Sequence, residues 1–480
     1  MKKVKFKRSI TRRRQRLVAQ RGRRLSPRSL VRDCAEGKKR GLGMLSHEHN
    51  DVLTRTGPDT VLGKMFRRYW HPVCLSSEVE GPDCDPVEVT LLGEDLVGFK
   101  DTDGRLGLLD ARCPHRGTAL SYGRNEEGGL RCINHGWKFT VTGECVDTPA
   151  EPEESTLKSK VCARSYPCEE RGGIVWAYMG PPGTSPAFPE FVWTTIPSEY
   201  TFVSKWLQES NYYNAIDGAT DSHVAILHSF LKDQDRTAAR GEQLAPLLFQ
   251  DQRPVVFTET TDVGLMIATR RSVGGDRYLW RIAQFYFPYF IQMASAGHSN
   301  FWVPIDDEHC WNYCVSWRLD RPFAEWEKAQ MGTVGIHVRN TIAGTAIPVA
   351  NRSNRWLQDR TKQRMFNFSG IDQIPLQDAA VQCTMRAPRD GTTIPDRTRE
   401  HLASSDVGSI ETRARMLGAV KAFEDGLSPP GVGDSRGYRR CGAQVILARD
   451  ESWLEWAKEH LGPDQVPITI GHKWTAPMIM

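Results

Sequence analysis

The chain has 480 residues, a hydrophobic content of 39% and a formal net charge of +5 at pH 7. This length is enough for two or three domains with cores of their own, and no apolar run is long enough to cross a bilayer. The 12 cysteines lack the regular spacing of a disulfide framework, so we expect a reducing compartment, and the cytoplasm is the best interpretation.

The positive charge comes from the beginning of the chain. Residues 1–43 hold 17 Lys and Arg against Asp33 and Glu36, whereas the rest of the chain holds 46 basic and 56 acidic residues. The segment lacks the apolar stretch of a secretory signal, and nucleic acid or a membrane surface are alternative targets for its charge. We expect residues 1–43 to be a disordered extension, and we expect neither nucleic acid nor membrane as a partner of the protein.

The next elements indicate a first domain over residues 44–185. Residues 50–72 have a helical pattern, and residues 86–110 alternate polar and apolar side chains, which predicts strands and hairpins. Residues 172–178 are typical of a buried strand. The Gly-Pro-Pro-Gly sequence at 180–183 ends that strand and predicts the end of the domain.

A second domain is predicted over residues 186–480. Residues 206–230 have helical apolar spacing, and residues 253–319 are rich in aromatic and β-branched side chains, which favours an antiparallel sheet. Residues 398–425 are predicted to form a surface helix of mixed charge. The expected fold class is α+β, with an N-terminal β-domain and a C-terminal domain whose antiparallel sheet is flanked by helices.

The most diagnostic motif lies in the first domain. Cys113-Pro114-His115 is followed, after sixteen intervening residues, by Cys132-Ile133-Asn134-His135. Each pair offers one Cys and one His, whereas zinc ribbons pair Cys with Cys and zinc fingers place both Cys before both His. This order is typical of a Rieske [2Fe–2S] cluster, in which two Cys bind one iron and two His bind the other. We predict these four residues as cluster ligands; the alternative is a structural zinc site with mixed ligands.

The segments around this motif resemble a known family. CPHRG at 113–117, CINHGWKF at 132–139 and TGECVDTPAEPE at 142–153 resemble the N-terminal domain of Rieske non-haem iron oxygenases. The resemblance is closest to the subgroup typified by phthalate 4,5-dioxygenase and extends over most of the chain. One departure is Asn134, where the family usually has Tyr. The resemblance implies a Rieske domain followed by a catalytic domain that holds a mononuclear Fe(II).

A second pair of histidines, His223 and His228, lies in the second domain. Five residues of a regular helix turn about 500°, so the two side chains would diverge by about 140° unless the chain bends or the site lies at a helix end. Two unrelated core or surface histidines would have the same spacing. After a Rieske motif, however, the pair resembles the family's D-x-x-H-x-x-x-x-H signature. This resemblance implies that His223 and His228 bind the mononuclear iron.

The resemblance also implies a third iron ligand. The segment at 374–382 is similar to the family segment that supplies a carboxylate, and Asp378 takes the ligand position. The alternative is an Asp that caps a helix after Pro375. Two His and one carboxylate would leave three positions on Fe(II) open for O2 and substrate. With this triad complete, we expect His401, in another segment similar to the subgroup, to be structural.

The family signature also contains an acid that links a cluster His to an iron-bound His across a subunit boundary. In the family this Asp lies three residues before the first His, but Thr220 occupies that position here. We therefore predict Asp221 as the catalytic bridging acid, and Asp217 is the reserve candidate.

The function implied by the resemblance is that of a terminal oxygenase component. A Rieske cluster and mononuclear Fe(II) would activate O2 and oxygenate an aromatic substrate in aromatic catabolism. We expect this substrate to carry a carboxylate. The implied partners are a reductase that uses NAD(P)H, with or without a ferredoxin domain, and two further copies of the chain in a homotrimer. One alternative is an O-demethylase or monooxygenase that acts on a non-carboxylate substrate. An alternative of another class is a Rieske electron carrier without oxygenase activity.

A carboxylated substrate would need a cationic partner in the pocket, and Arg suits a carboxylate because of its planar fork. The candidates are Arg236 and Arg240 in the loop after His228, and Arg270 and Arg271 in a predicted strand, of which Arg271 is favoured. Neighbouring strand residues face opposite sides, so only one of the last two can point inward. The alternative is an uncharged pocket lined by Phe285, Phe287 and Tyr289.

Overall fold

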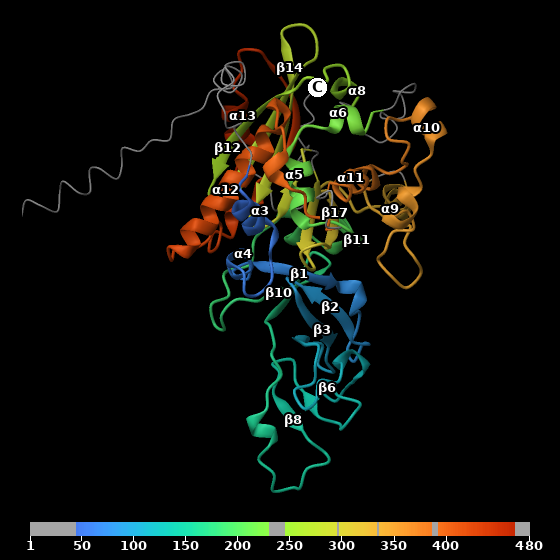
Figure 1. Ribbon diagram of the computed structural model, residues 1–480, viewed down its shortest axis with the longest axis vertical. Helices are drawn as coiled ribbons and strands as arrows, with labels where there is room; N and C mark the ends of the chain where they lie inside the picture. The colour runs from blue at the N-terminus through green and yellow to red at the C-terminus, as the bar shows by residue number, and fades with distance from the viewer. Residues whose placement is uncertain (1–44, 230–244, 295–296, 334–335, 386–391, 466–480) are drawn as a thin grey trace, which may run out of the picture. The chain divides into compact units, whose positions relative to one another are not determined.

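The computed structural model describes residues 45–229, 245–294, 297–333, 336–385 and 392–465 (Figure 1). The prediction for residues 1–43 lies outside the described residues. In the part of the chain that the structure describes, no helix combines the length and the apolar character needed to cross a membrane.

Two short helices precede the first strand. Helix α3 (His47–Thr54) begins at Ser46, whose side chain accepts a hydrogen bond from the backbone, and α4 (Val61–Phe66) begins in the same way at Thr60. The helical prediction for residues 50–72 is wrong at its end, because residues from Trp70 onward form strand β1. Pairing of this strand with a later one overrides the local apolar spacing.

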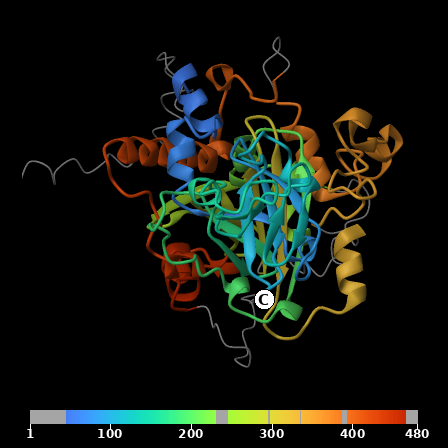
Figure 2. The ribbon, with the colours of Figure 1, turned by 90° about the horizontal axis from the view of Figure 1, so that it is seen from below.

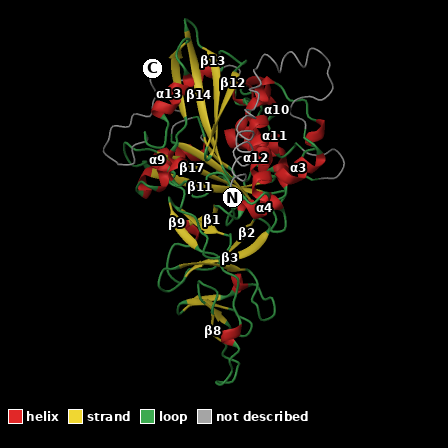
Figure 3. Ribbon diagram, turned by 90° about the vertical axis from the view of Figure 1, so that its left-hand side faces the viewer, coloured by secondary structure: helices red, strands yellow, loops and turns green. Residues whose placement is uncertain are grey.

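The first domain contains three small antiparallel sheets, drawn in yellow in the lower half of Figure 3. The first sheet has the order β1-β10-β9 and comprises β1 (Trp70–Leu75), β10 (Ile174–Tyr178) and β9 (Cys168–Arg171). The second sheet comprises β2 (Val87–Leu91), β3 (Glu94–Lys100) and β4 (Leu106–Asp110). The third sheet comprises β5 (Arg124–Glu126), β6 (Gly129–Arg131), β7 (Lys138–Phe139) and β8 (Cys145–Asp147). The strands predicted over 86–110 and 172–178 are confirmed.

The second domain is built on an eight-stranded antiparallel sheet of order β11-β17-β16-β15-β14-β13-β12, with β18 paired to β14. Its strands are β11 (Thr201–Gln208), β12 (Val255–Thr261), β13 (Gly264–Ser272), β14 (Arg277–Tyr286), β15 (Phe290–Gln292), β16 (His298–Pro304), β17 (Cys310–Trp317) and β18 (Ala443–Ala448). The sheet predicted over 253–319 is confirmed, as is the α+β class.

Helices of the second domain lie around this sheet. They are α5 (Tyr212–Thr220), α6 (Val224–Leu227), α8 (Ala245–Leu248), α9 (Glu325–Thr333), α10 (Arg360–Met365), α11 (Ile374–Gln382), α12 (Val407–Glu424) and α13 (Trp453–His460). Single-turn or short 3-10 helices occur at Ser76–Glu78, Leu120–Tyr122, Lys158–Lys160, Val192–Thr194, Ser198–Tyr200, Arg352–Leu357, Arg397–Arg399, Ser404–Asp406 and Arg436–Arg439. The helical prediction for 206–230 holds for α5 and α6, but its first residues complete strand β11.

The surface helix predicted over residues 398–425 is confirmed from Val407 onward as α12, whose Glu411, Lys421 and Glu424 are exposed, but its other face is buried more deeply than the charge pattern indicated. It contacts helices α3, α4 and α5 and strand β12, and Figure 2 shows the orange helix beside the blue N-terminal helices. Its buried face includes Thr412, Arg413 and Met416. The charge pattern did not reveal this buried face because Arg413 pairs with the acidic side chains of Asp217 and Glu400 inside the protein.

One hydrophobic core joins the first small sheet to the large sheet. Trp176 of β10 packs with Phe191, and both lie against Phe290 and Phe301 of the large sheet. A second, smaller core lies under the loops that carry the Cys–His motif and includes Phe139. The Cys–His motif therefore lies on the smaller core, and helix α5, which precedes His223, packs on the larger one.

Candidate functional site

Two loops of matching geometry carry the Cys–His motif. In loops 113–118 and 132–137 the cysteine N–H donates to the carbonyl five residues later, at 2.9 and 2.8 Å respectively. The glycine four residues after each cysteine donates to the cysteine carbonyl, at 2.9 and 3.0 Å. Both glycines, Gly117 and Gly136, have positive φ values of +76° and +74°, which a side chain would strain. The chain therefore forms the same turn twice.

The loops bring the four predicted ligands together. The rings of His115 and His135 lie edge to face with centroids 4.5 Å apart, and Trp137 stacks on His115 at 4.4 Å. Cys113 and Cys132 are 2% and 3% exposed, and their thiols are within hydrogen-bonding distance. The sulfur ligands are thus shielded, whereas the histidine side of the group lies closer to solvent.

This donor set fits a two-iron cluster. Burial raises the pKa of the Cys113 thiol to about 11, with the neighbouring Cys132 thiol as a further cause. Nδ1 of His135 is buried and has no hydrogen-bond partner. A buried polar atom without a partner is costly unless something binds it, and a metal ion would satisfy this nitrogen.

The histidine pair of the second domain lies at a break between two helices. Helix α5 ends at Thr220, and the next helix, α6, is a single turn that has His223 at its N-cap and His228 at its C-cap. The ring centroids are 5.2 Å apart. Because the helix is interrupted here, the side chains of His223 and His228 do not diverge as they would on one regular helix. Such a bend or helix end was predicted from the sequence.

Asp378 reaches this pair from a helix far along the chain. Its Oδ1 lies 3.0 Å from Nε2 of His223 and 3.3 Å from Nε2 of His228. The donor atoms of the three residues all lie within 4.8 Å of one another. Asp378 lies inside α11, whose N-cap is Gln373, so the alternative of a capping Asp is wrong. Figure 1 labels α5, α6 and α11 in one region of the domain.

The other nitrogen of each histidine is held by a neighbouring side chain. Asp221 accepts a 2.5 Å hydrogen bond from Nδ1 of His223 and a 3.0 Å bond from its backbone N–H. Gln377 accepts a 2.8 Å hydrogen bond from Nδ1 of His228. Both Nε2 atoms are therefore directed at Asp378, which is the orientation that a shared metal requires. The role of Gln377 was not predicted from the sequence, although Gln377 lies beside Asp378.

The electrostatics of this group also suit a cation. Burial opposes a charge on His223, yet the carboxylates of Asp221 and Asp378 raise its pKa well above the usual value. Burial likewise opposes the charge on Asp378, yet the histidines His228 and His223 lower its pKa far below the usual range. The group favours positive charge between the rings, and two nitrogens with one carboxylate form a donor set that fits Fe(II).

Asp217, the reserve candidate for the bridging acid, is occupied elsewhere. Its two carboxylate oxygens accept hydrogen bonds of 2.8 to 2.9 Å from Arg397 and Arg413. Both arginine side chains are almost fully buried, at 0% and 4% exposure. Arg413 also pairs with Glu400. Asp217 therefore neutralises two buried cations behind helix α5, and the structure directs Asp221, not Asp217, at the histidine pair.

We call His223, His228 and Asp378 the His–Asp group. A cavity of about 150 Å³ opens beside it. His223, His228 and Asp378 form part of its wall, and Asp221 also borders it. Arg281 of β14 is the one Arg or Lys among the described residues that line it. The apolar part of the wall includes Val224, Leu248, Phe249, Met293, Ile336 and Ile374.

The arginines singled out in the sequence lie elsewhere. Arg270 stacks on the ring of Tyr278, on the other face of the strand from Arg271. Arg271 is 1% exposed, and its guanidinium donates to Ser222 and Thr269; it is not part of the cavity wall. Burial, with Arg281 as a further cause, lowers the pKa of Arg271 to about 10. The sequence thus identified the inward face of the strand but missed Arg281.

The remaining sequence predictions for the pocket and for His401 have different outcomes. Arg236 and Arg240 lie outside the described residues. The uncharged alternative is wrong in its residues, because Phe285, Phe287 and Tyr289 are each 0% exposed in the hydrophobic core and do not line the cavity. His401 is exposed and does not join the His–Asp group.

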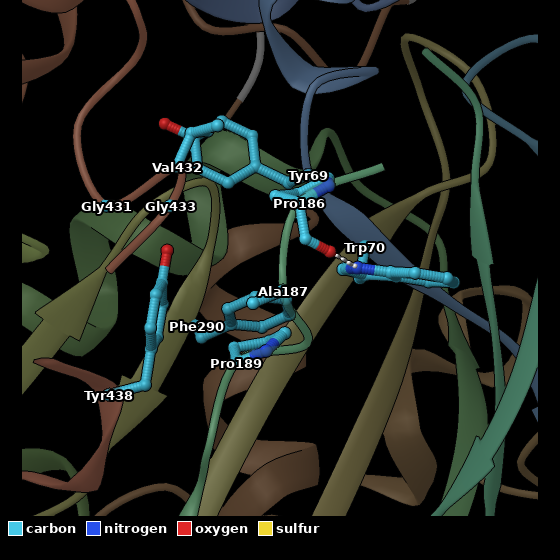
Figure 4. Close-up of a pocket in the computed structure, with 10 residues that line it drawn as sticks. All are labelled: Tyr69, Trp70, Pro186, Ala187, Pro189, Phe290, Gly431, Val432, Gly433 and Tyr438. Carbon is cyan, nitrogen blue, oxygen red and sulfur yellow. Dashed lines mark hydrogen bonds between the residues drawn. The ribbon is translucent and has the colours of Figure 1, made fainter. Parts of the chain in front are cut away.

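A second, much smaller pocket of about 10 Å³ lies between Trp70 and Phe290 on one side and residues 431–433, which follow α12, on the other (Figure 4). The indole N–H of Trp70 donates to the carbonyl of Pro186 across it. Its described walls are mainly aromatic rings, prolines and glycines, with no group of ligand-type side chains. It has too little room for a substrate and is a packing gap.

A pair of Cys–His loops on one scaffold and a His–His–Asp group beside a cavity on another are together typical of an iron-dependent oxidoreductase. Comparisons with known proteins give the family. Residues 69–167 match the Rieske [2Fe-2S] domain, and residues 177–468 match the LigXa C-terminal domain-like family. The phthalate 4,5-dioxygenase oxygenase subunit of Pseudomonas putida is 37% identical over 441 residues, covering 87% of this chain and 96% of that protein. The chain belongs to the Rieske non-haem iron oxygenases.

Further relatives agree with this assignment. The 3-chlorobenzoate-3,4-dioxygenase oxygenase subunit of Comamonas testosteroni is 34% identical over 412 residues, covering 81% of this chain and 92% of that protein. The solved structure of Pseudomonas putida CBB5 NdmA with caffeine has a TM-score of 0.53 and 18% identity, covering 82% of this chain and 100% of that one. At that identity the structural likeness concerns the fold.

Several predictions are confirmed by these findings. The protein is an oxygenase, an oxidoreductase that uses O2, and its family uses a Rieske [2Fe–2S] cluster together with a mononuclear iron. The alternative of an electron carrier without oxygenase activity has no support. The similar oxygenases are subunits of multi-component systems, so a reductase partner is implied.

Proposed function

We propose that this protein oxygenates an aromatic carboxylate in the cavity beside the His–Asp group. The observation that carries the proposal is Arg281, which lies in the cavity wall, with the buried Arg271 nearby. Arg271 donates to the hydroxyl groups of Thr269 and Ser222, so the neighbouring strands β13 and β14 place two arginines in this region, one of them in the cavity wall. Two relatives are named for phthalate and for 3-chlorobenzoate, which are both aromatic carboxylates.

The proposed ligands follow from the two groups of side chains. Cys113, His115, Cys132 and His135 would hold the [2Fe–2S] cluster, and His223, His228 and Asp378 would hold the mononuclear iron. When bound, the two centres supply single electrons and the activation of O2, respectively. The side chains around them orient the ligands, and the apolar wall of the cavity keeps water away from the reacting atoms.

Asp221 is our proposal for the residue that connects the iron-binding His223 to the incoming electron. Its Oδ1 receives both hydrogen bonds from His223, and its side chain remains 24% exposed, so its carboxylate is reachable from outside the chain. That exposure is compatible with a partner subunit that presents its cluster at this site, as in a homotrimer. Light scattering on the purified protein would give the mass of three chains, and the mass of one chain would contradict this arrangement.

The substrate class is tested by comparing an acid with its neutral ester. We expect phthalate to bind about 10-fold to 100-fold more tightly than dimethyl phthalate, because a charged hydrogen bond to Arg281 is lost in the ester. The variant Arg281→Met should remove most of this preference. Arg277→Met is the matched control, since Arg277 lies on the same strand but is exposed to solvent. Equal affinity of the unaltered protein for acid and ester would overturn the anion site.

A second candidate function is O-demethylation. The 5,5'-dehydrodivanillate O-demethylase oxygenase subunit of a Sphingobium species is 30% identical over 410 residues, covering 81% of this chain and 84% of that protein. Turnover of matched methoxylated and unmethoxylated aromatic acids separates the two reactions. Formaldehyde released in proportion to the O2 consumed would indicate demethylation, whereas a diol product would indicate dioxygenation.

Two further proposals concern organisation. We propose the division of the chain into a Rieske domain over residues 44–185 and a catalytic domain over 186–480. We also propose a cytoplasmic location, because the reductase that supplies electrons uses NAD(P)H and thiol ligands persist in a reducing compartment. Cell fractionation of the source organism with an antibody to the chain would test the location.

A further inference from the structure

The cavity has a polar end that the proposed metal ligands and Arg281 do not use. Gln208, Gln382 and Trp302 border it and bond to one another: the indole donates to Gln208 at 3.2 Å, and Gln208 donates to Gln382 at 2.7 Å. These three side chains fix one another and offer little to a ligand. Asn312, which also borders the cavity, is different.

Asn312 is a buried amide whose oxygen has no hydrogen-bond partner. It lies on β17 directly opposite Trp302 of β16 and Trp206 of β11, so its side chain shares the face of the sheet that carries the cavity. It is 2% exposed, and its Oδ1 has no partner. Among the described residues that line the cavity, it is the one carboxamide whose oxygen is buried and unsatisfied.

Such an atom is unfavourable unless a ligand uses it. A buried acceptor that has lost its water is destabilising, and sites built to bond a substrate hydroxyl reject analogues that lack it. The amide group of Asn312 could accept a hydrogen bond through its oxygen and donate one through its nitrogen. A hydroxyl group matches both roles, whereas a second carboxylate could only accept.

We infer that Asn312 is a specificity-determining residue for a hydroxyl substituent on the aromatic substrate. This inference rests on the proposed function only in taking the cavity as the substrate site. Arg281 and Asn312 then give two kinds of recognition in one cavity: charge for the carboxylate and a neutral hydrogen bond for the hydroxyl.

The test uses pairs of ligands that differ in one group. Hydroxybenzoates are compared with the corresponding fluorobenzoates, which are similar in size but cannot donate a hydrogen bond. Dissociation constants are measured by calorimetry on the full-length, metal-loaded protein without O2. For the best-binding isomer we expect the hydroxy acid to bind about 10-fold to 100-fold more tightly than the fluoro acid. Equal affinities in the unaltered protein would overturn the inference without any variant.

Variants assign the preference to one residue. Asn312→Leu keeps the volume and removes the amide, so the preference for the hydroxy acid should disappear. Tyr313→Phe is the matched control: it is the next residue of β17, faces the other side of the sheet and also loses a buried hydroxyl that has no partner. A preference that persists in Asn312→Leu, or that disappears equally in Tyr313→Phe, would contradict the assignment.

A neutral pair separates this inference from the carboxylate proposal. Phenol and fluorobenzene differ in the same way but carry no carboxylate. If phthalate and its ester bind equally while phenol still binds more tightly than fluorobenzene, the anion site fails and Asn312 stands. If the acid is preferred over the ester but phenol and fluorobenzene bind equally, the anion site stands and the role of Asn312 fails.

Discussion

The two groups of proposed metal ligands are built in opposite ways. The Cys–His group comes from two similar turns 19 residues apart in sequence, counted between Cys113 and Cys132, and it sits on a small core of its own. The His–Asp group joins His223 to Asp378, which are 155 residues apart, and it depends on helices held against the large sheet. The geometry of the Cys–His group depends on a short segment of the chain, whereas the geometry of the His–Asp group depends on the folding of the whole second domain.

This difference determines how each site should respond to change. Damage to a loop should destroy the first site and leave the second domain folded. Damage to the packing around α5 and α11 should disturb the second site and leave the first intact. The predictions that follow test this separation, beginning with the largest expected effect.

Replacement of Asp378 by Ala should abolish oxygenase activity. The variant removes the carboxylate that lies within 3.3 Å of both histidine Nε2 atoms, so under the proposed ligand set the mononuclear iron would lose its one anionic ligand. The absorption and low-temperature electron-spin signal of the Rieske cluster should remain, because the loops share no ligand with Asp378. Loss of the cluster signal together with activity would contradict the separation of the two sites.

Replacement of Asp217 by Asn should destabilise the second domain. The charge that neutralises the buried Arg397 and Arg413 is lost, which we expect to cost about 3 to 5 kcal/mol of folding free energy. The midpoint of thermal unfolding, followed by circular dichroism, should fall, while any folded fraction keeps its cluster. An unchanged midpoint combined with a loss of electron transfer would instead make Asp217 the bridging acid.

Replacement of Asp221 by Asn should slow turnover by about 10-fold to 100-fold while both metal centres remain bound. The amide keeps the size of the side chain but removes the carboxylate that holds Nδ1 of His223. Single-turnover experiments with the reduced protein would measure the rate at which the cluster is oxidised in the presence of substrate and O2. Rates equal to those of the unaltered protein would show that Asp221 has no part in this step.

Replacement of Gln377 by Leu should weaken iron binding by about 10-fold, since His228 loses the partner that fixes its ring. Gln377→Glu keeps an acceptor oxygen and should retain most of the affinity. Iron occupancy is measured after dialysis against a graded series of chelator concentrations. If Leu and Glu at this position gave the same occupancy, the hydrogen bond to His228 would not be what positions the ring.

The comparison also explains how much could be predicted from the sequence. The loop residues follow from order and spacing alone, because Cys113 and His115 lie in the same turn. His223 and Asp378 needed the resemblance to a family, since no local pattern shows that a residue of α11 will meet the end of α5. The capping alternative for Asp378 was wrong because the helix begins earlier, at Ile374, with Gln373 as its N-cap.

Other errors came from tertiary contacts that no local pattern records. The helix predicted up to residue 72 ends before Trp70, because the residues from Trp70 onward pair with β10 and this pairing outweighs the local apolar spacing. The charges of α12 predicted a surface helix, which holds for its exposed face, but Arg413 is buried and pairs with Asp217 and Glu400. Arg281 was missed because its place in the cavity wall depends on how the strands and helices assemble around it.

The central claim is that the chain holds two independent metal centres with the ligands proposed here. The most direct measurement is the iron and acid-labile sulfide content per chain of the unaltered protein, Cys132→Ala and Asp378→Ala, each with its electron-spin spectrum. The account predicts three irons and two sulfides for the unaltered protein on the stoichiometry of one [2Fe–2S] cluster and one mononuclear iron. Cys132→Ala should keep only the mononuclear iron, and Asp378→Ala only the cluster. If either variant lost both centres while remaining folded, or neither, the account would be contradicted.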